Sequence, residues 1–246
     1  MADRFYVSEP IVSDRVTLGG EEAHHLIHVL RAKTGQVVTL FDGGGGEFAA
    51  RIERIGRTGV ELAVEFRREV DRELPCELTL AVALPKGDRQ RWLIEKAVEL
   101  GVWRLVPLET ERSVAEPVDK ALQRMRRIVI EASKQCGRNR LMEIASPRDW
   151  SPWCAEAGSI RVTDLSRRRA MADPSGGVGT REWTESLRTG PTVRSVLLAV
   201  GPEGGWTEAE LAVASTHGWQ VLNLGPRILR VETAAVTLAA FFSLEG

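Results

Sequence analysis

Two glycine-marked segments near the carboxyl end of the chain hold the residues best suited to bind a ligand. Each is an apolar run that stops at a Gly-Pro turn and continues into residues typical of a helix start; the first covers 196–207 and the second 221–233. Glycine has no side chain, so backbone at such a turn can approach a ligand closely. Two such turns side by side would offer main-chain donors and acceptors to a polar cofactor.

An ordinary strand–turn–helix is the simpler interpretation of either turn. The first turn lacks the GK[ST] ending of a P-loop, which argues against ATP hydrolysis. Thr207 and Glu210 form the pattern of a capping box, which fixes a helix start without any ligand. The second turn favours a binding site, because Arg230 and Glu232 stand at the mouth of an otherwise apolar helix expected over 234–244.

Two other patterns suggest chemistry but are better explained by structure. The four glycines at 43–46 are followed by a strand-like segment, so they predict a hairpin and not a dinucleotide-binding loop. His24 and His28 are four residues apart, but no further metal-ligand pattern accompanies them, so we predict no metal site. The three cysteines include no CxxC pair and indicate reduced thiols.

The composition is typical of a cytoplasmic globular protein. Hydrophobic residues make up 43% of the chain, and no run approaches the roughly 20 apolar residues that a membrane helix needs. The first residues carry no charged-then-apolar leader, so we expect no export. The net charge is −1, yet residues 120–140 hold seven basic residues and one acidic residue. Such a basic face could meet nucleic-acid phosphates or could be a solvated helix surface.

The pattern of hydrophobic residues changes near residue 72, which predicts domains at 1–72 and 73–246. The first domain reads as a small β-barrel with one helix at 21–31. Its strands are expected at 15–18, 36–41, 47–55 and 60–66. In the second domain strands and helices alternate, which predicts an α/β fold with a mostly parallel sheet covered on both faces. An exposed loop is expected over 167–190.

Several motifs in this order resemble one enzyme family. The segments GPEGGWTEAEL (201–211) and LNLGPRILRVETAAV (222–236) resemble the cofactor-binding motifs of SPOUT-class RNA methyltransferases, whose C-terminal sheet is tied in a deep trefoil knot. Along nearly its whole length the chain resembles the ribosomal RNA small subunit methyltransferase E family. The other matching pieces are Arg4–Tyr6, His24–Leu26, Val29–Arg31, Lys86–Gly87, Ile94–Val102, Glu111–Ser113 and Glu131–Arg140.

This resemblance implies a homodimer that transfers a methyl group from S-adenosylmethionine to N3 of one uridine in small-subunit (16S) ribosomal RNA. The first domain would be a PUA-like RNA-binding barrel, and the partner would be the ribosomal RNA or the small ribosomal subunit. Cofactor contacts are implied at Leu198, Gly201, Glu203, Gly204, Gly205, Leu224, Gly225, Ile228, Leu229 and Arg230. RNA contacts are expected at Arg31, Lys33, Arg138, Asn139 and Arg140.

Arg230 and Glu232 are the candidates for catalysis of this reaction. Uridine N3 carries a proton, which must leave before the nitrogen can attack the activated methyl group. We expect the Arg230 guanidinium to stabilise the negative charge on the base and the Glu232 carboxylate to accept the proton. Residues two apart on a helix face different ways, so only one is expected to point into the site. Alternatively, Glu232 favours the helix start by its charge alone.

Two other functions compete with this one. The first is a non-catalytic RNA-binding or ribosome-assembly protein on the same fold. The glycine turn at 201–205 and the segment 224–233 argue against it, since a protein without a cofactor would not need them. The second is a SPOUT methyltransferase that acts on transfer RNA, which only the family resemblance disfavours.

Overall fold

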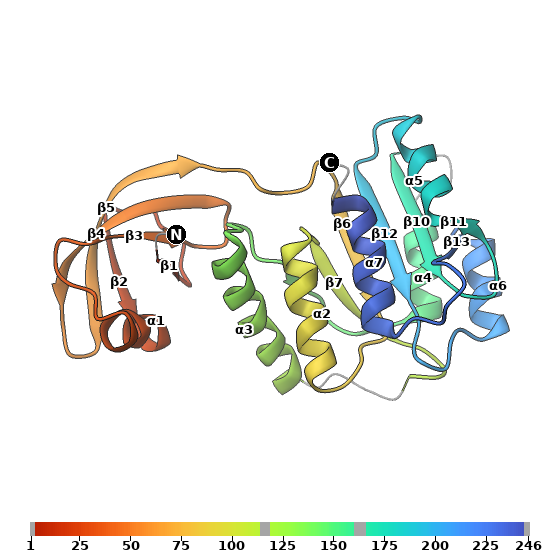
Figure 1. Ribbon diagram of the computed structural model, residues 1–246, viewed down its shortest axis with the longest axis horizontal. Coiled ribbons are helices and arrows are strands. Elements are labelled where there is room, and N and C mark those ends of the chain that lie inside the picture. Colours follow the sequence, from red (N-terminus) through yellow and green to blue (C-terminus); the bar gives the residue numbers. More distant parts are fainter. Residues whose placement is uncertain (1–2, 114–118, 160–165, 244–246) are drawn as a thin grey trace. The chain divides into compact units, whose positions relative to one another are not determined.

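The chain divides into two compact units, seen in a computed structural model that describes residues 3–113, 119–159 and 166–243 (Figure 1). The first unit comprises Met1–Glu73 together with Ile130–Leu141, and the second comprises Leu74–Val129 and Met142–Gly246. The sequence placed one boundary after residue 72. The structure adds the segment 130–141 to the N-terminal unit, because long-range contacts bring it there.

The first unit is built on a five-stranded sheet in the order β1-β3-β4-β5-β2. Its strands are β1 (Arg4–Tyr6), β2 (Arg15–Gly19), β3 (Val37–Phe41), β4 (Gly46–Ile55) and β5 (Gly59–Glu69). β3 and β4 pair antiparallel, so the hairpin predicted at the four glycines is confirmed. Gly43 and Gly45 adopt φ values of 83° and 101° in its turn, a region that glycine enters without strain.

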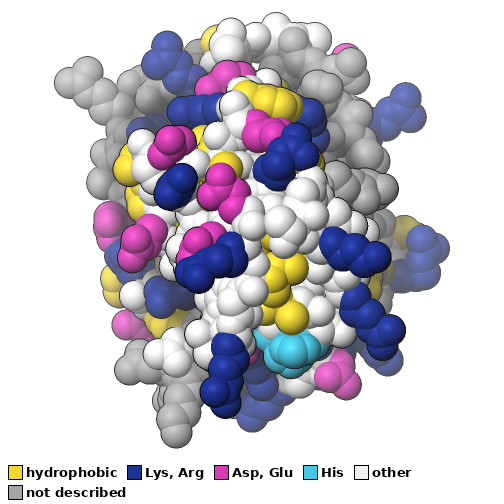
Figure 2. Space-filling view, turned by 90° about the vertical axis from the view of Figure 1, so that its left-hand side faces the viewer, with side chains coloured by type: hydrophobic (Ala, Val, Ile, Leu, Met, Phe, Trp, Pro, Cys, Tyr) yellow, Lys and Arg dark blue, Asp and Glu magenta, His cyan; other side chains and the backbone are white. Residues whose placement is uncertain are grey.

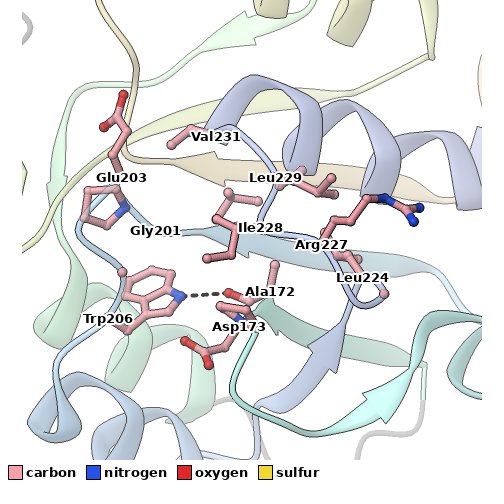
Figure 3. Close-up of a pocket in the computed structure, with 16 residues that line it drawn as sticks. Ala172, Asp173, Gly201, Glu203, Trp206, Leu224, Arg227, Ile228, Leu229 and Val231 are labelled. Carbon is pink, nitrogen blue, oxygen red and sulfur yellow. Dashed lines mark hydrogen bonds between the residues drawn. The ribbon is translucent and has the colours of Figure 1, made fainter.

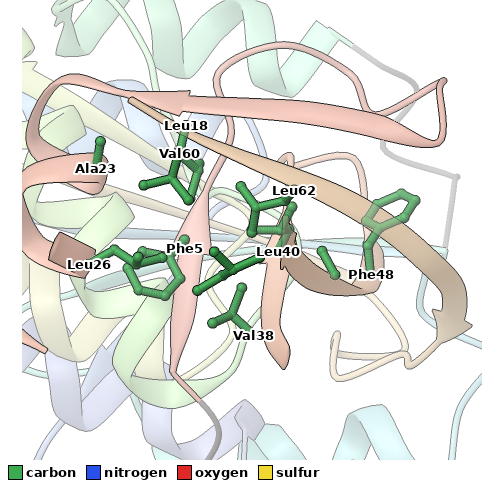
Figure 4. Packing of buried hydrophobic residues seen from close by; sticks show 11 residues of the cluster. Phe5, Leu18, Ala23, Leu26, Val38, Leu40, Phe48, Val60 and Leu62 are labelled. Atoms are coloured by element: carbon green, nitrogen blue, oxygen red, sulfur yellow. The ribbon is translucent and has the colours of Figure 1, made fainter. Parts of the chain in front are cut away.

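One short helix closes the core of this sheet. α1 (Gly20–His24) continues directly into the π-helical turn η1 (His25–Val29). Ala23 and Leu26 are buried, and Figure 4 shows them beside Phe5 and Leu18 in a cluster that the strands complete. The helix predicted at 21–31 therefore exists but ends at Val29. Ala23 and Leu26 of its apolar stripe pack in the core, whereas Leu30 is 38% exposed.

The second unit is a parallel sheet in the order β11-β13-β10-β12-β6-β7-β8, with β9 paired to β7 beside this path. Every strand pair in it is parallel. The strands are β6 (Glu77–Val82), β7 (Arg104–Glu109), β8 (Glu143–Ile144), β9 (Arg148–Asp149), β10 (Arg167–Ala172), β11 (Val178–Gly179), β12 (Ser195–Val200) and β13 (Gln220–Asn223). The predicted α/β fold is confirmed; the knot stays a prediction.

Helices cover this sheet on both faces. They are α2 (Asp88–Glu99), α4 (Trp150–Ser159), α5 (Thr180–Arg188), α6 (Glu208–Thr216) and α7 (Val231–Ser243). The remaining helix, α3 (Asp119–Cys136), begins in the second unit and ends in the first. Figure 1 shows α7 over the strands β6 and β12 with α2 beside it; α7 contacts both strands and α2. α4 and α6 pack together around a tryptophan-rich core that includes Trp150, Trp153 and Trp219. Within the described residues, no helix has the length and hydropathy to cross a bilayer.

The exposed loop predicted over 167–190 is wrong. β10 lies between β12 and β13 in the sheet, and Ala170 and Met171 on it are fully buried. The three arginines that begin this strand hide its apolar pattern in the sequence, since only its second half is hydrophobic. α5 follows, and Trp183 anchors it with an edge contact to Phe242.

Candidate functional site

A pocket opens where three neighbouring parallel strands end. Its lining includes Ala172 at the end of β10 with Asp173 and Pro174 after it, and Val200 at the end of β12 (Figure 3). The turn after β12 contributes Gly201–Trp206 except Gly204, and the segment after β13 contributes Leu224–Leu229 except Pro226. Val231 and Ala234 of α7 complete it. Because β10 lies between β12 and β13, the segments that follow the three strands reach the same edge of the sheet. In open parallel sheets this carboxyl edge is where ligands bind.

The first glycine turn owes its shape to Trp206. A Cβ atom on Gly201 would lie 2.8 Å from Cε2 of Trp206, so only glycine fits beneath the indole. The Trp206 Nε1 donates a 2.9 Å hydrogen bond to the carbonyl of Ala172, drawn dashed in Figure 3, and so ties the turn to the end of β10. Gly205 adopts a left-handed φ of 70°. The indole therefore fixes the backbone that a ligand would meet.

A second element braces the same turn from outside. Arg112 Nη1 donates a 2.8 Å hydrogen bond to the carbonyl of Gly204. Thr207 and Glu210 form the predicted capping box, and Glu210 Oε1 also accepts a 3.1 Å bond from the amide of Glu111. The motif at 111–113 thus positions the glycine turn and the start of α6.

The second glycine turn presents apolar side chains to the pocket. Gly225 has a φ of 106°, and its amide donates a 2.7 Å bond to Asn223 Oδ1. Ile228 lines the pocket although it is 90% exposed, and Figure 3 shows it between Trp206 and Leu229. An exposed apolar side chain at a pocket gains most from a ligand that covers it.

Most of the residues that the family resemblance places against a cofactor meet in this pocket. Those in its lining are Gly201, Glu203, Gly205, Leu224, Gly225, Ile228 and Leu229. Leu198 is fully buried within β12, and neither Gly204 nor Arg230 belongs to the lining. The sequence did not identify Trp206 as a pocket residue. It also did not identify Ala172, Asp173 and Pro174, because the segment that contains them was predicted to be an exposed loop.

The two candidate catalytic residues occupy different environments at the start of α7. Arg230 is exposed, and its carbonyl accepts the amide of Ala234 at 2.9 Å. Glu232 is 6% exposed and lies outside the pocket lining. Its Oε2 atom is 3.8 Å from Arg89 Nη1 on α2 and accepts no hydrogen bond within the described residues.

The five candidate RNA contacts all belong to the first unit, where they divide by exposure. Arg31, Lys33 and Arg140 are exposed. Arg138 is 3% exposed and forms a 2.6 Å ion pair with Glu73. Asn139, equally buried, accepts a 2.6 Å hydrogen bond from Arg4.

The exposed face of the first unit mixes cations with apolar side chains. Val29 and Phe66 are 62% and 47% exposed, and the guanidinium of Arg68 lies 4.9 Å from the Phe66 ring centroid. Figure 2 shows Lys and Arg side chains around hydrophobic ones, with Asp and Glu side chains among them and a histidine nearby. Cations that meet phosphates and apolar groups that meet bases are the features single-stranded RNA binding uses.

Two titratable groups outside the pocket have pKa values that their surroundings shift. Burial alone would raise the pKa of Glu47, but hydrogen bonds from Arg4 and Arg72 outweigh it and hold this pKa below its usual value. Burial raises the pKa of the Cys154 thiol to about 12, against a small opposing effect of Arg169, so this cysteine is no nucleophile at neutral pH. Among the described residues no three metal-ligating side chains gather into a site.

Comparison with known proteins matches both units. The RNA methyltransferase domain family matches residues 72–243, and the RNA methyltransferase PUA domain matches residues 18–65. Ribosomal RNA small subunit methyltransferase E from a Synechocystis strain is 34% identical over 98% of this chain and 77% of its own length. The enzyme of the same name from Bacillus subtilis is 31% identical over 89% of this chain and 85% of its own length.

Solved structures agree along the whole chain. A putative methyltransferase from Legionella pneumophila, in complex with bound SAM, superposes with a TM-score of 0.86 at 31% identity and covers 100% of this chain and 98% of its own. A ribosomal RNA small subunit methyltransferase E from Neisseria gonorrhoeae, bound to S-adenosyl methionine, has a TM-score of 0.84 at 30% identity, covering 98% and 96%. The chain therefore belongs to the ribosomal RNA small subunit methyltransferase E family of RNA methyltransferases.

Proposed function

We propose that this protein transfers a methyl group from S-adenosylmethionine to N3 of one uridine in small-subunit (16S) ribosomal RNA. The observation that carries the proposal is the convergence of both glycine turns on one pocket at the carboxyl edge of the sheet. The pocket lies in the part of the chain that matches the RNA methyltransferase domain. Two relatives of similar fold hold this cofactor.

The pocket fits such a cofactor by its chemistry. Leu224, Ile228 and Leu229 offer an apolar surface on which an adenine ring can pack. The glycine backbones at 201, 205 and 225 offer amides and carbonyls to the polar edge of that ring. When bound, the cofactor supplies a methyl group already activated on a sulfonium sulfur. The protein then has to hold the uridine in line with that methyl group and to lower the cost of removing the N3 proton.

Arg230 is the residue we propose for stabilising charge on the uridine. It is exposed at the start of α7, within two residues of the pocket-lining Ile228 and next to Val231. A guanidinium there would favour the deprotonated base, whose negative charge spreads onto its oxygens. Glu232 is the weaker candidate for the proton acceptor, because its carboxylate lies outside the lining and beside Arg89.

For RNA binding we propose the exposed cations Arg31, Lys33 and Arg140 of the first unit. Arg138 and Asn139, which we also expected at the RNA, hold the segment 130–141 to the sheet through Glu73 and Arg4. Their proposed contribution is therefore to position Arg140. We further propose that the protein is a cytoplasmic homodimer that acts on ribosomal RNA or on the assembled small subunit.

The direct test uses labelled S-adenosylmethionine and small ribosomal subunits from cells that lack this activity, with the modified nucleoside identified by mass spectrometry. We expect 3-methyluridine at one position. Incorporation into transfer RNA instead would overturn the substrate, and no heat of cofactor binding in calorimetry would point to the non-catalytic RNA-binding alternative.

A matched pair of glycine variants ties the activity to this pocket. Gly201→Ala places a Cβ atom against Trp206, so we expect cofactor affinity and methyl transfer to fall at least tenfold. Gly179→Ala is the control, because open space surrounds that position and its backbone, with φ of −64°, suits alanine. Equal activity in the two variants would show that the reaction occurs elsewhere.

A further inference from the structure

Arg89, in the first turn of α2, lies outside the pocket lining and between two carboxylates, beside the edge of the pocket formed by Glu203, which we call the rim. Its Nη1 atom lies 3.4 Å from Glu203 Oε1 and 3.8 Å from Glu232 Oε2. Its side chain is 43% exposed, and within the described residues its Nε and Nη2 atoms make no hydrogen bond. The guanidinium therefore keeps donors available for a ligand.

Glu232 accounts for the position of this guanidinium. α2 packs against α7, where the Glu232 side chain is only 8% exposed and its Oε2 accepts no hydrogen bond from the part of the chain that the structure describes. A buried carboxylate is costly unless a cation lies beside it. Arg89 is the cation that lies beside it, so charge attraction to Glu232 favours a guanidinium at the rim.

Glu203 brings an acceptor to the same place. It belongs to the lining of the pocket through the first glycine turn, and its side chain is half exposed. Figure 3 shows its carboxylate directed away from Trp206. A ligand in the pocket whose end reaches Glu203 thus also meets Arg89. The Glu203 carboxylate can bind a cationic group of that ligand, and the Arg89 guanidinium beside it can bind an anionic group.

We propose that Glu203 and Arg89 bind the amino-acid end of S-adenosylmethionine. The carboxylate of that end would pair with Arg89 and its ammonium with Glu203, while Glu232 keeps Arg89 in place. The ammonium and carboxylate groups of an α-amino acid are carried on one carbon. They can therefore bind a Glu and an Arg side chain that lie next to each other. The inference rests on the proposed cofactor and adds the residues that recognise its non-adenosine end.

The ion pair of Arg89 and Glu203 can also open so that each side chain binds the ligand instead. An exposed ion pair contributes little net free energy, so a ligand can replace the Glu203 contact at small cost. The guanidinium would then remain neutralised by Glu232 and by the ligand carboxylate. Arg89 and Glu203 are binding residues on this account, and Glu232 is a positioning residue.

Calorimetry with two ligands tests the assignment. S-adenosylmethionine carries the amino-acid end, whereas methylthioadenosine keeps the adenosine and the sulfur but lacks that end. We expect Arg89→Ala and Glu203→Gln each to weaken the binding of S-adenosylmethionine about tenfold or more, as loss of a charge-assisted hydrogen bond does, and to leave methylthioadenosine unchanged. Arg91→Ala is the matched control, because Arg91 lies on the same helix and pairs with Glu95 at 2.8 Å; it should change neither affinity.

Decarboxylated S-adenosylmethionine separates the two partners. It keeps the ammonium and lacks the carboxylate, so its affinity should depend on Glu203 and no longer on Arg89. Glu232→Gln should weaken S-adenosylmethionine less than Arg89→Ala does, and Arg89→Lys should restore part of the loss.

Each contrary outcome has a distinct meaning. Equal losses for both ligands in Arg89→Ala would show that Arg89 only shapes the pocket, and the inference would fail. An unchanged S-adenosylmethionine affinity, with weaker and less salt-dependent RNA binding, would assign the guanidinium to an RNA phosphate. If the unmodified protein binds neither ligand, the proposed cofactor itself is wrong.

Discussion

Two sets of arginine–carboxylate pairs, one in each unit, differ in burial and in length. In the first unit Arg138 meets Glu73 at 2.6 Å and Arg4 meets Glu47 at 2.7 Å, with each of the four side chains at most 15% exposed. At the rim of the pocket Arg89 meets its carboxylates at 3.4 and 3.8 Å with its guanidinium partly in solvent. Short buried pairs fix the structure, and long exposed ones leave an arginine available to a ligand.

The largest effect should come from breaking the pair whose arginine is the most buried. Arg138→Ala leaves the Glu73 carboxylate buried without its cation, so we expect the first unit to lose roughly 3–5 kcal/mol of stability. All seven tryptophans lie in the second unit, so tryptophan fluorescence follows that unit while circular dichroism follows both. Urea unfolding should show a dichroism transition at lower urea than the fluorescence transition. Coincident transitions at the unmodified midpoint would contradict the structural role.

The same kind of pair should make stability depend on pH. The pKa of Glu47 is below its usual value in the folded protein, so its pair stabilises fully above the ordinary carboxyl pKa near 4.5 and loses that effect as the pH falls through the lower folded pKa. Glu47→Gln should cost about 3 kcal/mol at pH 7 and progressively less below pH 4.5. Dichroism-detected urea unfolding at pH 7, 5, 4 and 3 measures the difference, and a constant difference would refute this account.

A substitution in the pocket lining should change the affinity for the cofactor and leave the stability of the ligand-free protein unchanged. Ile228→Ala removes apolar surface that a ligand would cover, so we expect cofactor affinity to fall about tenfold, equivalent to roughly 1–2 kcal/mol. Because Ile228 is 90% exposed, the ligand-free melting temperature should not move. Val12→Ala, at a side chain that is 92% exposed in the first unit, is the control and should alter neither quantity. A lowered melting temperature with intact affinity would place Ile228 in the fold instead of the site.

The smallest effect should come from an exposed cation. Arg140→Ala should weaken RNA binding only a few-fold and reduce the slope of log affinity against log salt by about one, as loss of one phosphate contact does. The ligand-free stability and cofactor affinity should stay unchanged. Filter binding at several salt concentrations provides the slope, and the same slope in both proteins would remove Arg140 from the RNA surface.

These comparisons separate what local patterns predict from what they miss. The hairpin at Gly43–Gly46 and the capping box of Thr207 and Glu210 were confirmed because each depends on a few adjacent residues. The strand β10 was missed, since its three arginines hide it and only its neighbours β12 and β13 make it a buried strand. With it the sequence missed the β10 part of the pocket.

The sequence by itself determined the two glycine turns, the α/β order and the apolar lining of the second turn, because backbone conformation and hydrophobic period are local properties. Only the tertiary structure decided which charges are buried. It placed Arg138 against Glu73, 65 residues away in the chain, and Arg89 against Glu203, 114 residues away. Burial and ion pairing depend on contacts between distant segments, so one-dimensional patterns of charge carry no information about which arginines hold the fold and which can meet a ligand.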